Sequence, residues 1–530
     1  MKNKRQHTYN SFWHSTSAAT VRMFDRFVLF FLFAFGVAAI INFGAWWFQE
    51  EHIDTSWMFY LVSVVFWYGI IRMLFTWYTY VSVKRTPAPK PPKGLSVAIF
   101  TTSYKGEPLE MVEKTLEACA HVSYPHTTYL LDNTEDPAFK NAAEKHGAVW
   151  LELLNIPGAK AGKINKALRK TTEEFILILD PDHIPFPNFF DEVLGYFTDS
   201  EVGFVQVSQA YYNQYRSFVA KGAAQQTYAF YGITQMGYYG NDSAVAIGAN
   251  CTFRRAAFES IGGHVEGLAE DLQTSLQLHA AGWKSVYNPV VVNRGLVPED
   301  FHTFCTQQLK WARGALEVLF VDLPAVFHKL NWKQKITYIS VASYYINGLT
   351  VFLFTLFPFL FLLTDTMPVN MTISEFFIHG SWLFVAAVLF NLYTQKWMCD
   401  SKRERGFHFN AMILKYAMWP VFLYSLVLSL INIKIPYVPT EKKGRNVQSP
   451  FVKPLFWYVL LFIFTTVGVL IYRRFFIQPG DLLTSTSRVW VMLGFAFVAF
   501  LLAAMALFLV NKKNKNVDSE PWNEISDIKN

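Results

Sequence analysis

The hydrophobic positions of this chain form two patterns: long unbroken apolar runs toward both ends, and short apolar runs between them. A membrane-spanning helix needs about 20 consecutive, mostly apolar residues. A further run, 410–433, is ambiguous because it contains Lys415 and Pro420. The runs that reach or approach the required length, and that we expect to be spans, are 27–48, 57–83, 336–364, 376–395, 456–471 and 489–510.

The basic residues between these runs predict how the chain crosses the membrane, because cytoplasmic loops carry an excess of Lys and Arg. Basic clusters precede the first run, follow the second and the last, and occur in "SKRERG" and "EKKGR". The last two clusters lie on the same side only if 410–433 does not cross. We therefore expect an interfacial or re-entrant helix there, six spans, and both ends in the cytoplasm. Arg473 and Arg474 break the rule in this arrangement, and seven spans are the alternative.

From about residue 95 to 330 the pattern changes to short apolar strands separated by helix-like stretches. Strands are expected at "LSVAIFTT", "TTYLLDN", "EFILILD" and "VGFVQVS", and helices at "PLEMVEKTLEACAHV" and "KINKALRKTTE". This alternation is typical of a mostly parallel α/β sheet. Such sheets bind ligands at the carboxyl ends of their strands, where Asp132, Asp180 and Asp182 are expected to lie.

Composition agrees with a membrane protein that carries a soluble domain. Of the 530 residues, 52% are hydrophobic and 17% are aromatic, which is too apolar for an ordinary soluble domain. The net charge of +7 fits basic cytoplasmic loops better than a nucleic-acid surface. The four cysteines lack paired or metal-like spacing, so a reducing compartment fits and a zinc site does not. The polar N-terminus and the length of the first run predict no cleaved signal peptide.

Two carboxylates at the end of one predicted strand are the first candidates for chemistry. The stretch "FILILDPDHIP" reads as a strand buried on both faces that ends in Asp180 and Asp182. Like charges this close raise each other's cost of ionisation, so a cation is expected between them. Carboxylate oxygens suit Mg²⁺ or Mn²⁺. An ordinary solvated turn explains Asp-Pro-Asp equally well, and a turn-forming Asp-Asn pair explains Asp132.

Three further stretches combine charged residues with a predicted helix. "GAKAGKINKAL" begins a helix with Lys160 and Lys163, which suits either phosphate or a solvated helix start. "GLAEDLQTS" begins a helix with Glu270 and Asp271, which either meet the helix dipole or provide a general base. "FHTFCTQQLKWARG" supplies either a packed Trp with solvated cations or a diphosphate site with a sugar-stacking ring; its polar candidates are Gln307, Lys310, Trp311 and Arg313.

The order of these stretches resembles a known family. "SYKGEP", "LLDN", "AKAGKIN", "LDPDHIP", "AEDLQTS", "QQLKWARG" and a later "YVPTEKKG" are similar to successive motifs of the processive family-2 membrane glycosyltransferases. The resemblance covers roughly residues 95 to 510 and is greatest to bacterial cellulose synthase catalytic subunits, while hyaluronan and chitin synthases share the core. It implies an α/β GT-A (Rossmann-like) glycosyltransferase domain in the cytoplasm, inserted in an α-helical transmembrane domain of about six spans with interfacial helices.

The resemblance divides the chain into segments and places it in a bacterial plasma membrane, with the catalytic domain on the cytoplasmic side. It leaves no room for a cyclic di-GMP-binding PilZ domain after the last span, so regulation of that kind is not expected. The expected segments are a cytoplasmic N-terminus (1–26), two transmembrane helices (27–83), the glycosyltransferase domain with an interfacial helix (95–330), a transmembrane hairpin (336–395), an interfacial helix and gating loop (396–451), a second hairpin (454–510) and a cytoplasmic tail (511–530).

The resemblance also implies roles for single residues. Asp271 would be the catalytic base, and Asp180 and Asp182 would hold Mg²⁺ or Mn²⁺. The acceptor would contact Trp311, Glu270 and Gly248. The "YVPTEKKG" stretch would be a gating loop that closes over the nucleotide, although a plain basic cytoplasmic loop is the alternative. The residues expected to bind the nucleotide sugar are Tyr104, Glu107, Asp132, Lys160, Asp180, Gln307, Lys310, Arg313, Thr440 and Lys442.

Together these roles imply a processive, inverting enzyme that polymerises a β-linked, cellulose-like polysaccharide from a UDP-sugar, most simply UDP-glucose, and moves it across the membrane. Its partners would be the donor, the growing polysaccharide, the bilayer and accessory secretion subunits, without nucleic acid. The departures from the family pattern leave sugar and linkage open: Lys310 replaces an arginine, "AED" replaces "TED", "AVAIGANC" replaces "FFCGS", and "SYKGEP" has one extra residue. The alternatives are transfer of one sugar to a lipid, and an inactive scaffold or transport subunit.

Overall fold

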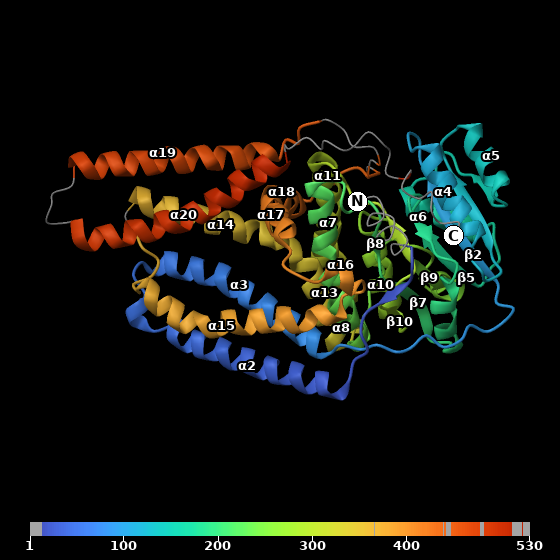
Figure 1. Ribbon diagram of the computed structural model, residues 1–530, viewed down its shortest axis with the longest axis horizontal. Helices are drawn as coiled ribbons and strands as arrows, with labels where there is room; N and C mark the ends of the chain where they lie inside the picture. Colours follow the sequence, from blue (N-terminus) through green and yellow to red (C-terminus); the bar gives the residue numbers. More distant parts are fainter. Residues whose placement is uncertain are drawn as a thin grey trace, which may run out of the picture.

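A domain built on β-sheet and a set of long helices extending from it make up the protein (Figure 1). The computed structural model describes residues 13–364, 366–437, 439, 440, 442, 447–476, 482–510 and 522. The predicted N-terminal segment up to residue 12, and the predicted tail apart from Trp522, lie outside the described residues.

A seven-stranded sheet forms the centre of the first part, in the order β10-β7-β9-β5-β2-β3-β4. All neighbouring pairs are parallel except those of β9, which runs antiparallel to β5 and β7. This confirms the predicted, mostly parallel α/β fold. The strands are β2 (Val97–Ser103), β3 (Thr127–Asp132), β4 (Val149–Glu152), β5 (Phe175–Leu179), β7 (Val202–Val207), β9 (Cys251–Arg254) and β10 (Lys284–Asn288).

The central strand β5 is buried on both faces because its five residues, FILIL, are all apolar. Ile176 and Ile178 face one core, whereas Leu177 and Leu179 face the other, as the alternation of side chains along a strand requires. The helices that pack around the sheet are α4 (Leu109–Ala120), α5 (Pro137–Lys145), α6 (Ala159–Leu168), α8 (Gln235–Gly240), α9 (Arg255–Ser260) and α10 (Glu270–Ala280).

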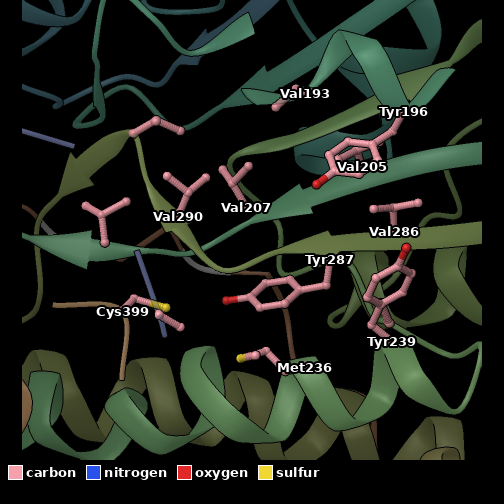
Figure 2. Close-up of a cluster of buried hydrophobic side chains, with 14 of the residues drawn as sticks. Val193, Tyr196, Val205, Val207, Met236, Tyr239, Val286, Tyr287, Val290 and Cys399 are labelled. Carbon is pink, nitrogen blue, oxygen red and sulfur yellow. The ribbon is translucent and has the colours of Figure 1, made fainter. Parts of the chain in front are cut away.

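A continuous apolar cluster joins the sheet to the helical part. Figure 2 shows Tyr287 of β10 and Val207 of β7 above Met236 of α8, with Cys399 beside them. The Tyr287 hydroxyl and the Cys399 thiol both donate to the main-chain carbonyl of Tyr231, the latter at 3.3 Å. Helix α8 also contacts the long helix α3 (Ser56–Val81), so the sheet is packed against the helical part through a shared core.

A small second sheet lies at the carboxyl edge of the large one. Its order is β6-β12-β8, and β6 begins two residues after Asp182. A separate two-stranded pairing joins β1, near the start of the described chain, to β11. These strands are β1 (Thr16–Ser17), β6 (Ile184–Pro185), β8 (Ala210–Tyr211), β11 (Val290–Val291) and β12 (Asn293–Gly295).

Among the described residues, six helices are long and apolar enough to cross a membrane, which agrees with the six predicted spans. No more than 33% of the most apolar window of each is buried inside the protein, so most of their side chains are at least partly exposed. These helices are α2 (Met23–Trp47), α3, the stretch Trp332–Thr364 that contains α13 (Trp332–Ala342) and α14 (Asn347–Thr364), α15 (Ile373–Thr394), α19 (Val452–Phe476) and α20 (Leu482–Val510).

The ambiguous run contains two helices, α17 (Phe409–Ala417) and α18 (Trp419–Leu430), which meet at a bend of 42°. Pro420 lies in the first turn of α18, where its missing N–H would interrupt a continuous helix. The pair forms either a broken span or a re-entrant segment, so the interfacial assignment of 410–433 stays a prediction.

The sheet domain meets the long helices through shorter ones (Figure 1). Helix α17 packs on α7, and α18 packs on α11 and α14. Helix α11, which carries the "QQLKWARG" residues, therefore contacts α18, which in turn contacts the candidate span that contains α14. The connecting helices are α7 (Phe218–Ala229), α11 (Phe301–Glu317), α12 (Leu323–Val326) and α16 (Ser401–Glu404).

Candidate active site

The carboxyl ends of β2, β3 and β5 bring the predicted site residues to one edge of the sheet. Tyr104 follows the last residue of β2, Asp132 is the last residue of β3, and Asp180 follows β5 directly. These strands are neighbours and run parallel, so their ends lie side by side. The topology thus places these predicted residues at one edge of the sheet, and their role as a binding site stays a prediction.

The two carboxylates of the Asp-Pro-Asp turn each pair with a lysine. Asp180 pairs with Lys160, and Asp182 accepts from the Lys442 ammonium at 3.0 Å and from the Leu296 amide at 3.0 Å. Burial alone would raise the pKa of Asp182, but Lys442 beside it holds that pKa well below its usual range. Asp182 is therefore a buried carboxylate that stays ionised because cations surround it.

His183 is a third polar group at this turn, and the sequence reasoning missed it. Its Nδ1 lies 3.4 Å from Asp182 Oδ1, and its buried Nε2 has no hydrogen-bond partner among the described residues. Ligand atoms of Asp180, Asp182 and His183 lie within 4.8 Å of one another. Two carboxylates and an imidazole are a donor set that fits Mn²⁺, and the carboxylates alone fit Mg²⁺. The signal was available, because His183 directly follows the acidic pair in the sequence.

Asp132 lies at this edge but is largely engaged by the protein itself. Its carboxylate accepts from the Ser103 hydroxyl at 2.6 Å, the Thr134 amide at 3.0 Å and the Trp150 indole N–H at 3.0 Å. The bond to Thr134, two residues on, is the turn geometry that served as the alternative explanation. Asp132 therefore ties β2, β3 and β4 together, and a contact to a nucleotide stays a prediction.

Tyr104 and Glu107, which are partly buried, and the buried Lys163 form a group beside the acidic pair. Glu107 Oε2 accepts from the Tyr104 amide at 2.9 Å, and burial raises the pKa of Glu107 to about 7. Lys163 lies 3.3 Å from the Tyr104 ring centroid and donates to the Ser103 carbonyl at 2.8 Å. Of the two lysines of "AKAGKIN", Lys163 therefore lies against the face of the Tyr104 ring, whereas Lys160 pairs with Asp180.

The start of α10 brings the predicted base to the same place. Lys160 donates to the Gly248 carbonyl as well as to Asp180. A Cβ at Gly248, whose φ is +80°, would lie 3.4 Å from Asp271 Oδ2, so the Gly248 backbone lies against the Asp271 carboxylate. Burial and the neighbouring Glu270 carboxylate raise the pKa of Asp271 to about 7. A carboxylate with that pKa is suited to accept a proton near neutral pH.

Helix α11 places four predicted residues in four different surroundings. Gln307 lines a small cavity together with Thr440 and Lys442. Lys310 lies 4.6 Å from the Tyr437 ring centroid, and Trp311 is partly exposed, with 38% of its surface accessible. The Arg313 guanidinium is not directed at the acidic pair, because it donates to the Ile433 carbonyl at 3.1 Å and pairs with Glu317 at 3.1 Å.

The segment after α18 crosses this site. The rings of Tyr437 and Tyr104 have centroids 6.4 Å apart, and Lys442 reaches Asp182. Val438, Glu441 and residues 443–446 of the predicted gating loop lie outside the described residues. Of the predicted residues, the structure brings together Tyr104, Glu107, Lys160, Asp180, Asp182, Gly248, Glu270, Asp271, Gln307, Lys310, Thr440 and Lys442.

Comparison with known proteins gives two overlapping matches to protein families. Residues 91–314 match the family described as glycosyltransferase-like family 2, and residues 259–508 match the cellulose synthase family. The cellulose synthase catalytic subunit (UDP-forming) of Komagataeibacter sucrofermentans is 28% identical over 392 residues, covering 71% of this chain and 50% of that protein. The corresponding subunit of Pseudomonas fluorescens is 25% identical over 418 residues, covering 76% and 55%. The chain thus spans about half the length of the curated relatives it matches.

Among solved structures, the chain resembles a mannosyltransferase from Pyrobaculum calidifontis determined in complex with GDP-Man and Mn²⁺. The TM-score is 0.50 at 15% sequence identity, and the match covers 76% of this chain and all of that one. This likeness concerns the fold, a GT-A domain accompanied by helices.

Proposed function

We propose that this chain, a cellulose synthase-like glycosyltransferase of family 2, polymerises a β-linked glucan from a UDP-sugar, most simply UDP-glucose. We further propose that it passes the product across the membrane. The observation that carries this proposal is the position of Asp271. Its carboxylate has a pKa raised to about 7 and lies beside Gly248, whose carbonyl accepts from the same lysine that pairs with Asp180. Lys160 and Gly248 thus connect the proposed proton acceptor, Asp271, with Asp180 of the proposed cation-binding pair.

The residues at the acidic turn support a divalent cation, either Mg²⁺ or Mn²⁺, held by Asp180 and Asp182 with His183 beside them. When bound, such an ion neutralises charge on a diphosphate leaving group. The Pyrobaculum mannosyltransferase of the same fold was determined with Mn²⁺. The features of this chain that fit the ion are the buried Asp182 carboxylate, the half-buried Asp180 carboxylate and His183 Nε2, which has no hydrogen-bond partner among the described residues.

The chain's own cations surround the position proposed for the diphosphate. Lys160 is buried, Lys310 and Lys442 are partly buried, and all three act on the charge of Asp180. Positive charge fixed in a buried site stabilises the charge that develops on a departing UDP. Lys310 replaces the arginine of the family motif and offers a point charge without a bidentate fork. Tyr104 and Glu107, at the end of β2, would bind the nucleoside part.

In the proposed reaction, Asp271 accepts the proton of an acceptor sugar hydroxyl as the oxygen attacks the anomeric carbon of the donor. The bond to the UDP oxygen breaks on the opposite face, so an α-linked donor gives a β-linked product. A sugar hydroxyl is a poor nucleophile at neutral pH, and a positioned base typically contributes about 10²- to 10⁴-fold in rate. Glu270 and Gly248 would lie beside the acceptor.

The placement of α11 supports processive synthesis. Trp311 is partly exposed on the helix that connects the site to α18 and thereby to the candidate spans. An aromatic ring there would stack on the acceptor sugar and align its terminal hydroxyl with Asp271. The product would leave between the membrane helices of a bacterial plasma membrane, with the sheet domain on the cytoplasmic side and with accessory secretion subunits as partners.

The experiment that tests this proposal uses the purified protein in lipid with Mg²⁺ or Mn²⁺ and a panel of radiolabelled UDP-sugars. High-molecular-weight product from one donor, digested by a hydrolase specific for one β-linkage and lost in Asp271→Asn, is the expected result. Transfer of a single sugar to lipid would replace the proposal with the non-processive reaction. Absence of turnover with every donor, with and without cell membranes from the source as a supply of partner subunits, would favour an inactive scaffold or transport subunit.

A further inference from the structure

Arg313 does not act where the other polar residues of its helix act. Its side chain is 4% exposed, its Nε donates to the Ile433 carbonyl at 3.1 Å, and its Nη1 pairs with Glu317 at 3.1 Å. Ile433 is 120 positions away in the sequence and lies just beyond the end of α18. The guanidinium is therefore engaged at the point where the chain leaves α18 and starts toward the site.

The end of α18 explains why this point is suited to an anchor. Asn432 has a φ of +55°, and the Ile433 amide donates back to the Leu428 carbonyl at 2.9 Å, which is a common way to end a helix. The chain changes direction at Asn432, so the Ile433 carbonyl is the first main-chain hydrogen-bond acceptor after the turn. A charge-assisted bond from a buried arginine is stronger than a neutral one and fixes that direction.

Helix α11 makes a second contact with the segment at Tyr437, four residues after Ile433. Lys310, which lies one helical turn before Arg313, sits 4.6 Å from the ring centroid of Tyr437. Residues three apart on a helix share one face. Helix α11 thus holds the segment at Ile433 and at Tyr437, and the segment continues to Thr440 and to Lys442, which pairs with Asp182.

We propose that Arg313 is a positioning residue for the segment 433–442 and not a ligand of the nucleotide. Its Nε and Nη1 already donate to the Ile433 carbonyl and to Glu317, and Glu317 balances its charge, so the guanidinium is committed to this end of α18. Arg313 acts through Tyr437 and Lys442, whose approach to the acidic pair depends on where the segment begins. The anchoring itself is independent of the proposed function, whereas its effect on substrate binding rests on it.

The first test measures how firmly the segment is held, without substrate. Trypsin can cleave after Lys442 once this side chain has left Asp182, so the rate of cleavage there in the metal- and nucleotide-free protein reports the anchoring. We expect Arg313→Ala to speed cleavage here by about tenfold or more, as loss of a hydrogen bond to a charged group predicts. Arg313→Lys keeps the charge and one donor and should fall between Arg313→Ala and the unaltered protein.

A matched control exists elsewhere in the chain. Arg254 is also largely buried, donates to the main-chain carbonyls of Phe197 and Val202, and pairs with Glu174, far from the segment. Arg254→Ala should leave cleavage after Lys442 unchanged. An Arg313→Ala protein that remains folded, with cleavage equal to that of Arg254→Ala, would overturn the proposal. If Arg313→Ala does not fold, Arg313→Lys provides the same comparison.

The second test separates a positioning role from a direct contact, using UDP as the probe in a double-mutant cycle with Tyr437→Ala. If Arg313 acts by placing Tyr437, each single change weakens UDP binding and the double change is no worse than the larger single one. Losses that add in full would show a direct contact to the nucleotide and contradict the inference. Failure of the proposed function is distinguishable, because it would abolish UDP binding in the unaltered protein and leave the cleavage result intact.

Discussion

The Lys442 ammonium lies 3.0 Å from Asp182 Oδ1, at the turn where the proposed divalent cation would bind. Lys442 comes from a segment 260 positions away, and it brings one positive charge to a carboxylate that is 1% exposed. A metal ion at Asp182 must therefore compete with an ammonium group of the same chain, unless the segment first moves.

The first prediction concerns this competition. Lys442→Met should raise the affinity for Mn²⁺ in the absence of nucleotide by about tenfold, because removal of a buried ion-pair partner leaves Asp182 free to ligate. Titration of Mn²⁺ followed by electron paramagnetic resonance measures the affinity directly. Lys434→Met, a change at an exposed lysine of the same segment, should leave it unaltered. Weaker Mn²⁺ binding in Lys442→Met would mean that Lys442 assists the metal.

The second prediction concerns the base. Asp271→Asn keeps the shape of the side chain but cannot accept a proton, so turnover should fall by about 10²- to 10⁴-fold. The thermal midpoint and the Mn²⁺ affinity should stay close to those of the unaltered protein, which excludes a general loss of structure. Turnover within about twofold of the unaltered protein would assign the base to another group.

The third prediction is a pH dependence. Burial and the Glu270 carboxylate raise the pKa of Asp271 to about 7, and a base works only when deprotonated. The turnover number should therefore rise with pH through about 7 and level off above it. Glu270→Gln removes the neighbouring negative charge, which should lower the pKa of Asp271 and move the rise to lower pH. A rise at the same pH in both proteins would contradict the assignment of the titrating group to Asp271.

The fourth prediction concerns the acceptor. Trp311→Ala should lower polymer formation by about tenfold or more, because an aromatic surface for the acceptor sugar is lost. The KM for the donor should change little, since Trp311 is not placed at the acidic pair. Trp311→Phe should restore most of the synthesis. Equal defects in Trp311→Ala and Trp311→Phe would point to the indole N–H in place of the ring surface.

The fifth prediction concerns stability. Arg294 of β12 and Asp400 form an ion pair at 3.1 Å whose side chains are 1% and 3% exposed. Asp400→Ala leaves a buried guanidinium with less compensation, and such losses typically cost about 3–5 kcal/mol. The thermal midpoint in detergent should fall clearly. Lys284→Met, which removes the exposed ion pairs of Lys284 with Asp199 and Glu201, is the control and should leave the thermal midpoint nearly unchanged.

Local sequence features were sufficient to predict four strands of the large sheet, β2, β3, β5 and β7, and the edge at which Asp132, Asp180 and Asp182 lie, but β4, β9 and β10 were not predicted. The FILIL run is typical of a strand buried on both faces, and the acidic turn then follows at its carboxyl end. His183 could have been added to the acidic pair on the same reasoning. The six candidate spans follow from length and apolarity alone.

Contacts between distant segments could not be predicted from local features. The pairing of Arg313 with Ile433 and of Lys442 with Asp182 depends on how α11 and α18 pack, which hydrophobic periodicity does not specify. The antiparallel direction of β9 and the 42° bend between α17 and α18 likewise follow from tertiary packing. For this reason the motif carrying Arg313 suggested a nucleotide contact, whereas the structure places its guanidinium at the start of the segment.

The most direct measurement of the central claim is the length of the product at the earliest times of synthesis, with protein in excess over the chains begun. A processive polymerase gives long β-linked polymer from the first turnover cycles, while most of the UDP-sugar is still unused, and Asp271→Asn gives none. We expect long polymer from the unaltered protein at the earliest times. Products that all carry one added sugar, with no longer chains at any time, would contradict this expectation.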